Sequence, residues 1–112
     1  IQGHRAVSIW GTGKALREFL FVEDLAQALI FLMHQYHEHT HINVGTGIDI
    51  TIKDLALLIQ KIIGYQGSLV FDTSRPDGTP KKLLNVDKLT ALGWRASTSL
   101  EEGLKKTIAW YI

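Results

Sequence analysis

Apolar residues recur at every third or fourth position after residue 21, and this spacing predicts an amphipathic helix over about residues 22–36. The acidic residues Glu23 and Asp24 fall in its first turn, where they suit the positive end of the helix dipole. We expect the apolar stripe of this helix to be buried. The stripe consists of Val22, Leu25, Ala26, Leu29, Ile30, Met33 and Tyr36.

Two further helices are predicted by their apolar spacing together with their capping residues. Thr51 with Asp54 resembles a capping arrangement, with Asp in place of the usual Glu. The helix that follows should end at Gly64, because glycine readily adopts the left-handed conformation found just beyond a helix end. Ser99 with Glu102 forms a capping box that should open the last helix of the chain.

Short apolar runs between the helices predict strands. These runs lie at residues 7–10, 17–21, 42–44 and 69–71. A short helix is expected over about residues 85–92, ending at Gly93. Because strands and helices alternate, the predicted fold class is α/β. The 112 residues suit one domain or a part of one, and we find no repeat or linker that would divide them.

Composition narrows the classes of function. The chain has 12 Lys+Arg against 11 Asp+Glu, and this net charge of +1 is too small to favour nucleic acid as a partner. The absence of cysteine excludes disulfides and thiolate catalysis within the chain, and it suits a cytoplasmic protein. The longest apolar run, at residues 29–33, is too short to span a membrane, so no membrane partner is expected.

A glycine-rich turn, Gly11-Thr12-Gly13, follows the first predicted strand and could cradle a phosphate group. A dinucleotide-binding fingerprint would need a third glycine and an immediate helix. Leu16 stands at the third position instead, and the residues after it are typical of an extended segment. The motif by itself therefore indicates a turn between two strands rather than a cofactor site.

Trp10 and Arg17 flank this turn and could both bind a ligand. A tryptophan ring can stack on a purine or cover a sugar. An arginine can bind two oxygens of a diphosphate, and a charge-assisted bond of this kind is worth about 1.5–3 kcal/mol. The alternative is that Trp10 packs in the core and Arg17 pairs with Glu18 or Glu23. The residues alone favour this alternative.

Residues 72–82 form a loop by composition, and its length is unusual for a passive connection. It holds both prolines of the chain, and basic residues surround its central Asp77. Asp77 could accept hydrogen bonds from a sugar or a base, and Lys82 could reach a phosphate. A simple Asp-Gly turn with solvated lysines explains the composition equally well.

Catalytic and metal-binding sets are not evident. Four histidines cluster near residues 34–41, but no Cys, Asp or Glu completes a convincing ligand set, so we interpret them as part of a polar turn. The chain has no nucleophile elbow and no Tyr followed four residues later by Lys. We therefore predict no catalytic residue, no cofactor-binding residue and no metal site in this chain.

Three stretches taken in order resemble one family. They are W-G-T-G at 10–13 leading into R-E-F-L-F-V-E-D-L-A at 17–26, H-I-N-V-G-T-G at 41–47, and P-D-G-T-P-K-K-L-L at 76–84. Together they resemble the C-terminal part of the GDP-L-fucose synthases, which are extended short-chain dehydrogenase/reductases. The resemblance runs from about residue 7 to the end of the chain.

The resemblance implies an activity and a division of labour. The family converts GDP-4-keto-6-deoxy-D-mannose to GDP-L-fucose by epimerisation at C3 and C5 and NADPH-dependent reduction at C4. It implies an N-terminal Rossmann domain that binds NADPH and carries the catalytic residues, none of which is in this chain. Residues 1–112 would be the substrate-binding portion of a cytoplasmic homodimeric enzyme, inactive by itself and starting with Ile rather than Met.

The resemblance also assigns substrate-binding residues. Trp10 and Arg17 would face the GDP-sugar, with Arg17 on the diphosphate, and Asp77 and Lys82 match substrate-contacting positions of the loop. Three alternatives stay open. The chain could be a non-catalytic GDP-sugar-binding module, a purely structural domain, or a fragment of a related NAD-dependent nucleotide-sugar epimerase or dehydratase.

Overall fold

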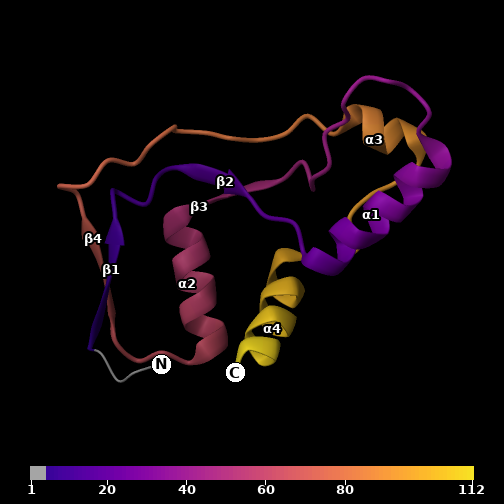
Figure 1. Ribbon diagram of the computed structural model, residues 1–112. Helices are drawn as coiled ribbons and strands as arrows, with labels where there is room; N and C mark the ends of the chain where they lie inside the picture. Colours follow the sequence, from indigo (N-terminus) through magenta and orange to yellow (C-terminus); the bar gives the residue numbers. More distant parts are fainter. Residues whose placement is uncertain (1–4) are drawn as a thin grey trace. The chain divides into compact units, whose positions relative to one another are not determined.

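Strands and helices are mixed along the chain in the computed structural model, which describes residues 5–112 (Figure 1). The strands are β1 (Ala6–Trp10), β2 (Leu16–Glu18), β3 (Asp49–Thr51) and β4 (Ser68–Asp72). The helices are α1 (Val22–Gln35), α2 (Ile52–Ile63), α3 (Asp87–Leu92) and α4 (Leu100–Tyr111). The predicted α/β class is confirmed, and each predicted helix begins and ends within a few residues of its expected place.

The helix ends confirm the capping predictions. The Thr51 hydroxyl accepts a hydrogen bond from the Asp54 amide at 3.1 Å, and the Ser99 hydroxyl accepts one from the Glu102 amide at 3.2 Å. Gly64 closes α2 with a φ of 76°, in the left-handed region. These short-range signals could be read from the sequence because each involves residues only a few positions apart.

Two strand predictions differ from the structure. Residues 42–44, predicted as a strand, are not paired in a sheet. The side chain of Asn43 instead donates to the Asn85 carbonyl at 3.2 Å. The run at 17–21 contributes only its beginning to β2, and the chain leaves the strand before α1 starts. Apolar content alone was a poor guide here because strand pairing depends on distant partners.

The chain divides into two compact units, each assembled from two separate segments. The first unit contains the chain up to Arg17 together with Asp49–Lys82. The second unit contains Glu18–Ile48 together with Leu83–Ile112. The first unit therefore holds β1, β3, β4, α2 and all of β2 except its last residue, and the second holds α1, α3 and α4.

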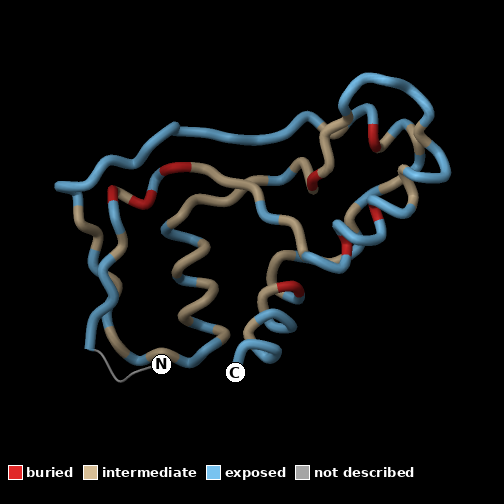
Figure 2. Tube along the Cα trace, viewed as in Figure 1, coloured by how far each residue is buried: buried red, intermediate tan, exposed pale blue. Residues whose placement is uncertain are grey.

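Parallel strands β1 and β4 organise the first unit. Their register aligns Ala6 with Ser68 and Trp10 with Asp72, so both strands end at the same edge. Helix α2 is attached to the turn that follows β1 through its first backbone amides. The amide of Ile52 donates to the Ala15 carbonyl, at 3.0 Å. That turn is the most buried part of the first unit (Figure 2).

A buried carboxylate organises the second unit. Asp24, in the first turn of α1, is only 2% exposed. It accepts hydrogen bonds from the Thr98 amide at 2.9 Å, the Thr98 hydroxyl at 3.0 Å and the Ser97 hydroxyl at 3.3 Å. Asp24 thus joins the start of α1 to the segment that leads into α4. The sequence had predicted only that Asp24 interacts favourably with the helix dipole.

The expected burial of the apolar stripe on α1 is wrong. Val22 is 66% exposed and Met33 78% exposed, whereas Ala28 is fully buried. Asp24 and Ala28 are four positions apart, so the buried side of α1 is not the predicted stripe. Figure 2 shows most of α1 as exposed. The helix has apolar residues on more than one side, and periodicity alone could not choose between them.

We predict that Asp24→Asn destabilises the fold by about 2–3 kcal/mol, because an amide nitrogen would face donors that now reach a buried acceptor. Urea unfolding followed by circular dichroism measures this change. Asp87→Asn is a matched control, since Asp87 is an exposed residue in the first turn of α3. Equal unfolding free energies for the two variants would contradict the assigned role of Asp24.

Candidate functional site

The predicted site residues lie at the carboxyl edge of the parallel β1–β4 pair. The Gly11-Thr12-Gly13 turn follows β1, and an arm, defined here as residues 73–82, follows β4. The Gly11 amide donates to the Asp72 carbonyl at 2.8 Å, which extends the pairing past the end of the strands. In open parallel sheets, ligands bind beyond the carboxyl ends of the strands, so this edge is the natural place for a site.

Asp77 fastens the arm to the turn. Its Oδ1 accepts a hydrogen bond from the Thr12 amide at 2.6 Å, and its Oδ2 accepts one from the Thr12 hydroxyl at 2.8 Å. A side chain at Gly11 would collide with the Asp77 carboxylate, and Gly11 has a φ of 88°. The turn after β1 therefore holds a carboxylate of its own chain, and its glycine permits the close approach.

The surroundings of Asp77 favour its ionised form. The backbone hydrogen bond from Thr12 lowers the pKa of Asp77 below its ordinary value of 3.8, and the Thr12 hydroxyl lowers it further. The positive charges of Lys14 and Arg17 act in the same direction, with smaller effects. Asp77 is thus a charged acceptor, and each of its oxygens retains a further lone pair for another donor.

Arg17 lies beside the arm in a half-buried position. Its Nη1 donates to the Leu16 carbonyl at 2.7 Å, and a Cβ placed on Gly78 would lie 3.5 Å from its Nη2. Within residues 5–112, no ion pair joins Arg17 to a carboxylate. The surface ion pair considered from the sequence, with Glu18 or Glu23, is therefore not formed.

Trp10 is 66% exposed, so the sequence interpretation that placed it in the core is wrong. The guanidinium carbon of Arg75 lies 4.7 Å from the centre of the Trp10 ring. Arg75 in turn pairs with Asp72, with Nε 3.8 Å from Oδ2. A cation–π contact at an exposed position contributes about 0.5–1 kcal/mol, enough to bias the orientation of the indole ring.

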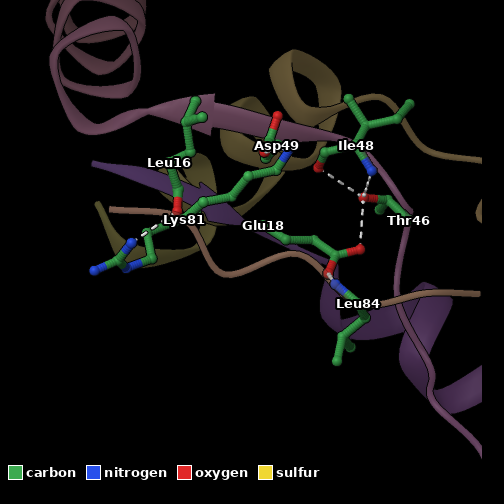
Figure 3. A network of polar contacts seen from close by, with 8 residues as sticks. Leu16, Glu18, Thr46, Ile48, Asp49, Lys81 and Leu84 are labelled. Carbon is green, nitrogen blue, oxygen red and sulfur yellow. Dashed lines mark hydrogen bonds and ion pairs between the residues drawn. The ribbon is translucent and has the colours of Figure 1, made fainter. Parts of the chain in front are cut away.

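The end of the arm runs alongside β2. The Leu16 amide donates to the Pro80 carbonyl at 2.8 Å, and the Lys82 amide donates to the Leu16 carbonyl at 3.2 Å. Nζ of Lys81 lies 3.8 Å from a carboxylate oxygen of Asp49, a long ion pair to an oxygen that accepts no hydrogen bond (Figure 3). The Lys82 side chain is exposed and forms no polar contact with residues 5–112.

All the predicted site residues belong to the first unit. They are Trp10, Arg17, Asp77 and Lys82. The structure brings the Arg17 charge close to Asp77 and leaves the side chains of Trp10 and Lys82 exposed, with Arg75 over the Trp10 ring. Sequence reasoning missed Thr12 and Arg75. The position of Thr12 between two glycines was a sequence signal that it lies in a turn. Its hydrogen-bond partner Asp77 is 65 positions away, so no local pattern indicated their contact.

None of the helices in the described part of the chain is long and apolar enough to cross a membrane. Over the same residues, no group of three or more His, Asp or Glu side chains is placed to hold a metal ion.

Comparison with known proteins identifies relatives over nearly the whole chain. The sequence model of the NAD dependent epimerase/dehydratase family matches residues 1–45. GDP-L-fucose synthase of Escherichia coli K12 is 50% identical, over 95% of this chain and 36% of its own length. GDP-L-fucose synthase 1 of Arabidopsis thaliana is 46% identical, over 100% of this chain and 35% of its own length.

A solved structure supports the same relationship. The NADP-bound GDP-L-fucose synthetase from Naegleria fowleri superimposes with a TM-score of 0.90 at 30% identity, over 95% of this chain and 34% of that one. The chain thus spans about a third of the length of the relatives it matches. Sequence and fold agree that the chain is similar, over nearly its whole length, to one part of the GDP-L-fucose synthases, which are extended short-chain dehydrogenase/reductases.

Proposed function

We propose that this chain is the substrate-binding portion of an enzyme that converts GDP-4-keto-6-deoxy-D-mannose to GDP-L-fucose. The observation that carries the proposal is the anchoring of the arm by Asp77 to Thr12. With the arm anchored in this way, a charged carboxylate lies together with an arginine and an exposed tryptophan at the carboxyl edge of a parallel strand pair. The identity of about 50% to GDP-L-fucose synthases adds independent support.

Arg17, Trp10 and Lys82 would bind the nucleotide part of the substrate. Arg17 lies beside the arm and is free of ion pairs within residues 5–112, so its guanidinium can take two oxygens of the diphosphate. The exposed ring of Trp10 can stack on a base or cover a sugar. The exposed ammonium of Lys82 can add a point charge near phosphate.

Asp77 would select for a donor on the ligand. Both of its oxygens already accept from Thr12, and the carboxylate is held in its charged form. Only a hydrogen-bond donor can use the remaining lone pairs, such as a sugar hydroxyl or an N–H of a base. Asp77 therefore contributes to orientation of the ligand as well as to the shape of the arm.

The nicotinamide cofactor would be bound outside this chain. The Gly11-Thr12-Gly13 turn does not fit a dinucleotide, because β2 rather than a helix follows it and Asp77 occupies the Thr12 donors. When bound elsewhere in the enzyme, NADPH supplies the hydride for reduction at C4. The residues of this chain would hold the keto-sugar in position, and the chain alone would not turn substrate over.

The exposed apolar stripe on α1 supports a role within a larger enzyme. Val22, Leu29 and Met33 lie on it, and each is more than half exposed. Contiguous apolar surface of this kind usually marks a contact with another protein segment. We propose residues 1–112 as one functional portion of a cytoplasmic homodimer, in line with the lack of cysteine.

We predict that the 112-residue chain binds GDP more tightly than UDP and catalyses no NADPH oxidation with the keto-sugar. Isothermal titration calorimetry with each nucleotide measures the preference, and circular dichroism verifies the fold. Equal binding of UDP would favour a related nucleotide-sugar epimerase or dehydratase. Absence of GDP binding by a folded chain would favour a structural role and contradict the proposal.

Replacing Arg17 with alanine should weaken GDP binding by about 2–5 kcal/mol, because the diphosphate would lose a charged, bidentate partner. The change is measured by the same titration. Arg95→Ala is the matched control, since Arg95 is exposed and lies in the second unit. An Arg17→Ala dissociation constant equal to that of the control would remove Arg17 from the site.

Replacing Thr12 with valine should raise the pKa of Asp77 toward its ordinary value of 3.8, because one of its two donors is lost. In the folded state, the hydrogen bonds from Thr12 favour the ionised form of Asp77. Their contribution to the stability of the fold is therefore present above pH 3.8 and is lost as the pH falls through the lowered pKa of Asp77. Carbon-13 NMR titration of the Asp77 carboxyl measures the shift.

Thr73→Val provides the control for this titration, because Thr73 is an exposed residue of the same arm. It should leave the pKa of Asp77 unchanged. A wild-type pKa at or above 3.8, or the same value in the Thr12 variant, would show that Thr12 does not hold the Asp77 carboxylate.

A further inference from the structure

Glu18 is the centre of a third carboxylate network, after those of Asp77 and Asp24, and it lies within the second unit (Figure 3). Its Oε2 accepts hydrogen bonds from the Gly47 amide at 2.6 Å and the Thr46 hydroxyl at 3.2 Å. Its Oε1 accepts one from the Leu84 amide at 3.1 Å. One half-buried carboxylate thus fixes two backbone amides that are far apart in the sequence.

This network needs an acceptor at both oxygens. The Gly47 amide, the Thr46 hydroxyl and the Leu84 amide all donate hydrogen bonds to Glu18. A carboxylate suits them because both of its oxygen atoms accept hydrogen bonds. A glutamine of the same shape could keep one connection but would turn an N–H donor toward the other. Glu18→Gln therefore removes one of the two attachments with little change in volume.

Gly45 provides the space for this carboxylate. A Cβ at position 45 would lie 2.5 Å from Oε2 of Glu18 and 3.0 Å from its carboxyl carbon. An alanine there would push the Glu18 side chain away from its donors. Gly45→Ala thus tests the network through a residue that forms none of these hydrogen bonds.

The residues held by Glu18 lie close to the places where the chain passes from one unit to the other. These passages follow residues 17, 48 and 82. Glu18 is the first residue after the first passage, Gly47 precedes the second by two positions, and Leu84 is the second residue after the third. The three passages are therefore tied together by one side chain within the second unit.

We propose that Glu18 is a positioning residue for the GDP-sugar site: by holding the Leu84 and Gly47 amides, it fixes where the arm ends and where the chain re-enters the first unit. Arg17 precedes Glu18 directly, and Lys82 precedes Leu84 by two positions. Fixing Glu18 to Leu84 thus restrains the chain just after each of these two proposed ligand-binding residues. This inference rests on the proposed function.

The test compares Glu18→Gln and Gly45→Ala with wild type in the 112-residue chain, using amide hydrogen exchange by NMR and GDP titration. The Gly47 or Leu84 amide should exchange at least about tenfold faster in each variant, since the loss of a hydrogen bond to a charged group is worth a factor of this order. Affinity for GDP should fall by about tenfold, the effect of a change of 1.4 kcal/mol.

Two controls separate local from global effects. The Thr98 amide, bonded to Asp24 in the same unit, should keep its protection if the unit stays folded. Glu101→Gln changes a half-exposed carboxylate that pairs with Lys105, at 3.5 Å, and should alter neither exchange at Gly47 and Leu84 nor GDP affinity.

The outcomes distinguish this proposal from the proposed function. Unchanged protection at both amides, or lost protection with unchanged GDP affinity, would overturn the positioning role of Glu18 alone. Failure of the wild-type chain to bind GDP would overturn the proposed function and the ligand part of this inference together. Faster exchange with weaker GDP binding, while Thr98 stays protected, is the result we expect.

Discussion

The parallel pairing of β1 with β4 is the constraint on which the rest of the proposed site depends. Because the strands are in register and run in the same direction, the turn after one and the arm after the other meet at a single edge. The two hydrogen bonds between Thr12 and Asp77 then set the course of the arm. Without the strand pairing, nothing would hold the charged groups of the turn close to those of the arm.

Much of the local structure could be predicted from the sequence. The caps at Thr51 and Ser99 and the stop at Gly64 involve neighbouring residues, so their signals are visible in the chain itself. The pairing of β1 with β4 joins residues about sixty positions apart, and the sequence of neither strand indicates which other strand it pairs with. The strand predicted at 42–44 was wrong for the same reason, since an apolar run forms a strand only where a partner accepts it.

The site residues were predicted only with help from the family resemblance. From the residues alone, Trp10 was expected in the core and Arg17 in a surface ion pair, and the structure contradicts both expectations. Thr12 and Glu18 escaped notice because their roles are to hold other segments through long-range hydrogen bonds. Such contacts follow from the fold rather than from any short motif.

Mapping of GDP on the chain by NMR chemical-shift perturbation tests the central claim most directly, because it reports which unit binds the nucleotide. We expect shifts at the Trp10 indole N–H, at the Thr12 amide and along the arm. Residues of the second unit far from Glu18 in sequence, such as Ile108, should not shift. Shifts confined to Glu18–Ile48 and Leu83–Ile112, or no shifts in a folded chain, would contradict the assignment of this edge as a GDP-sugar site.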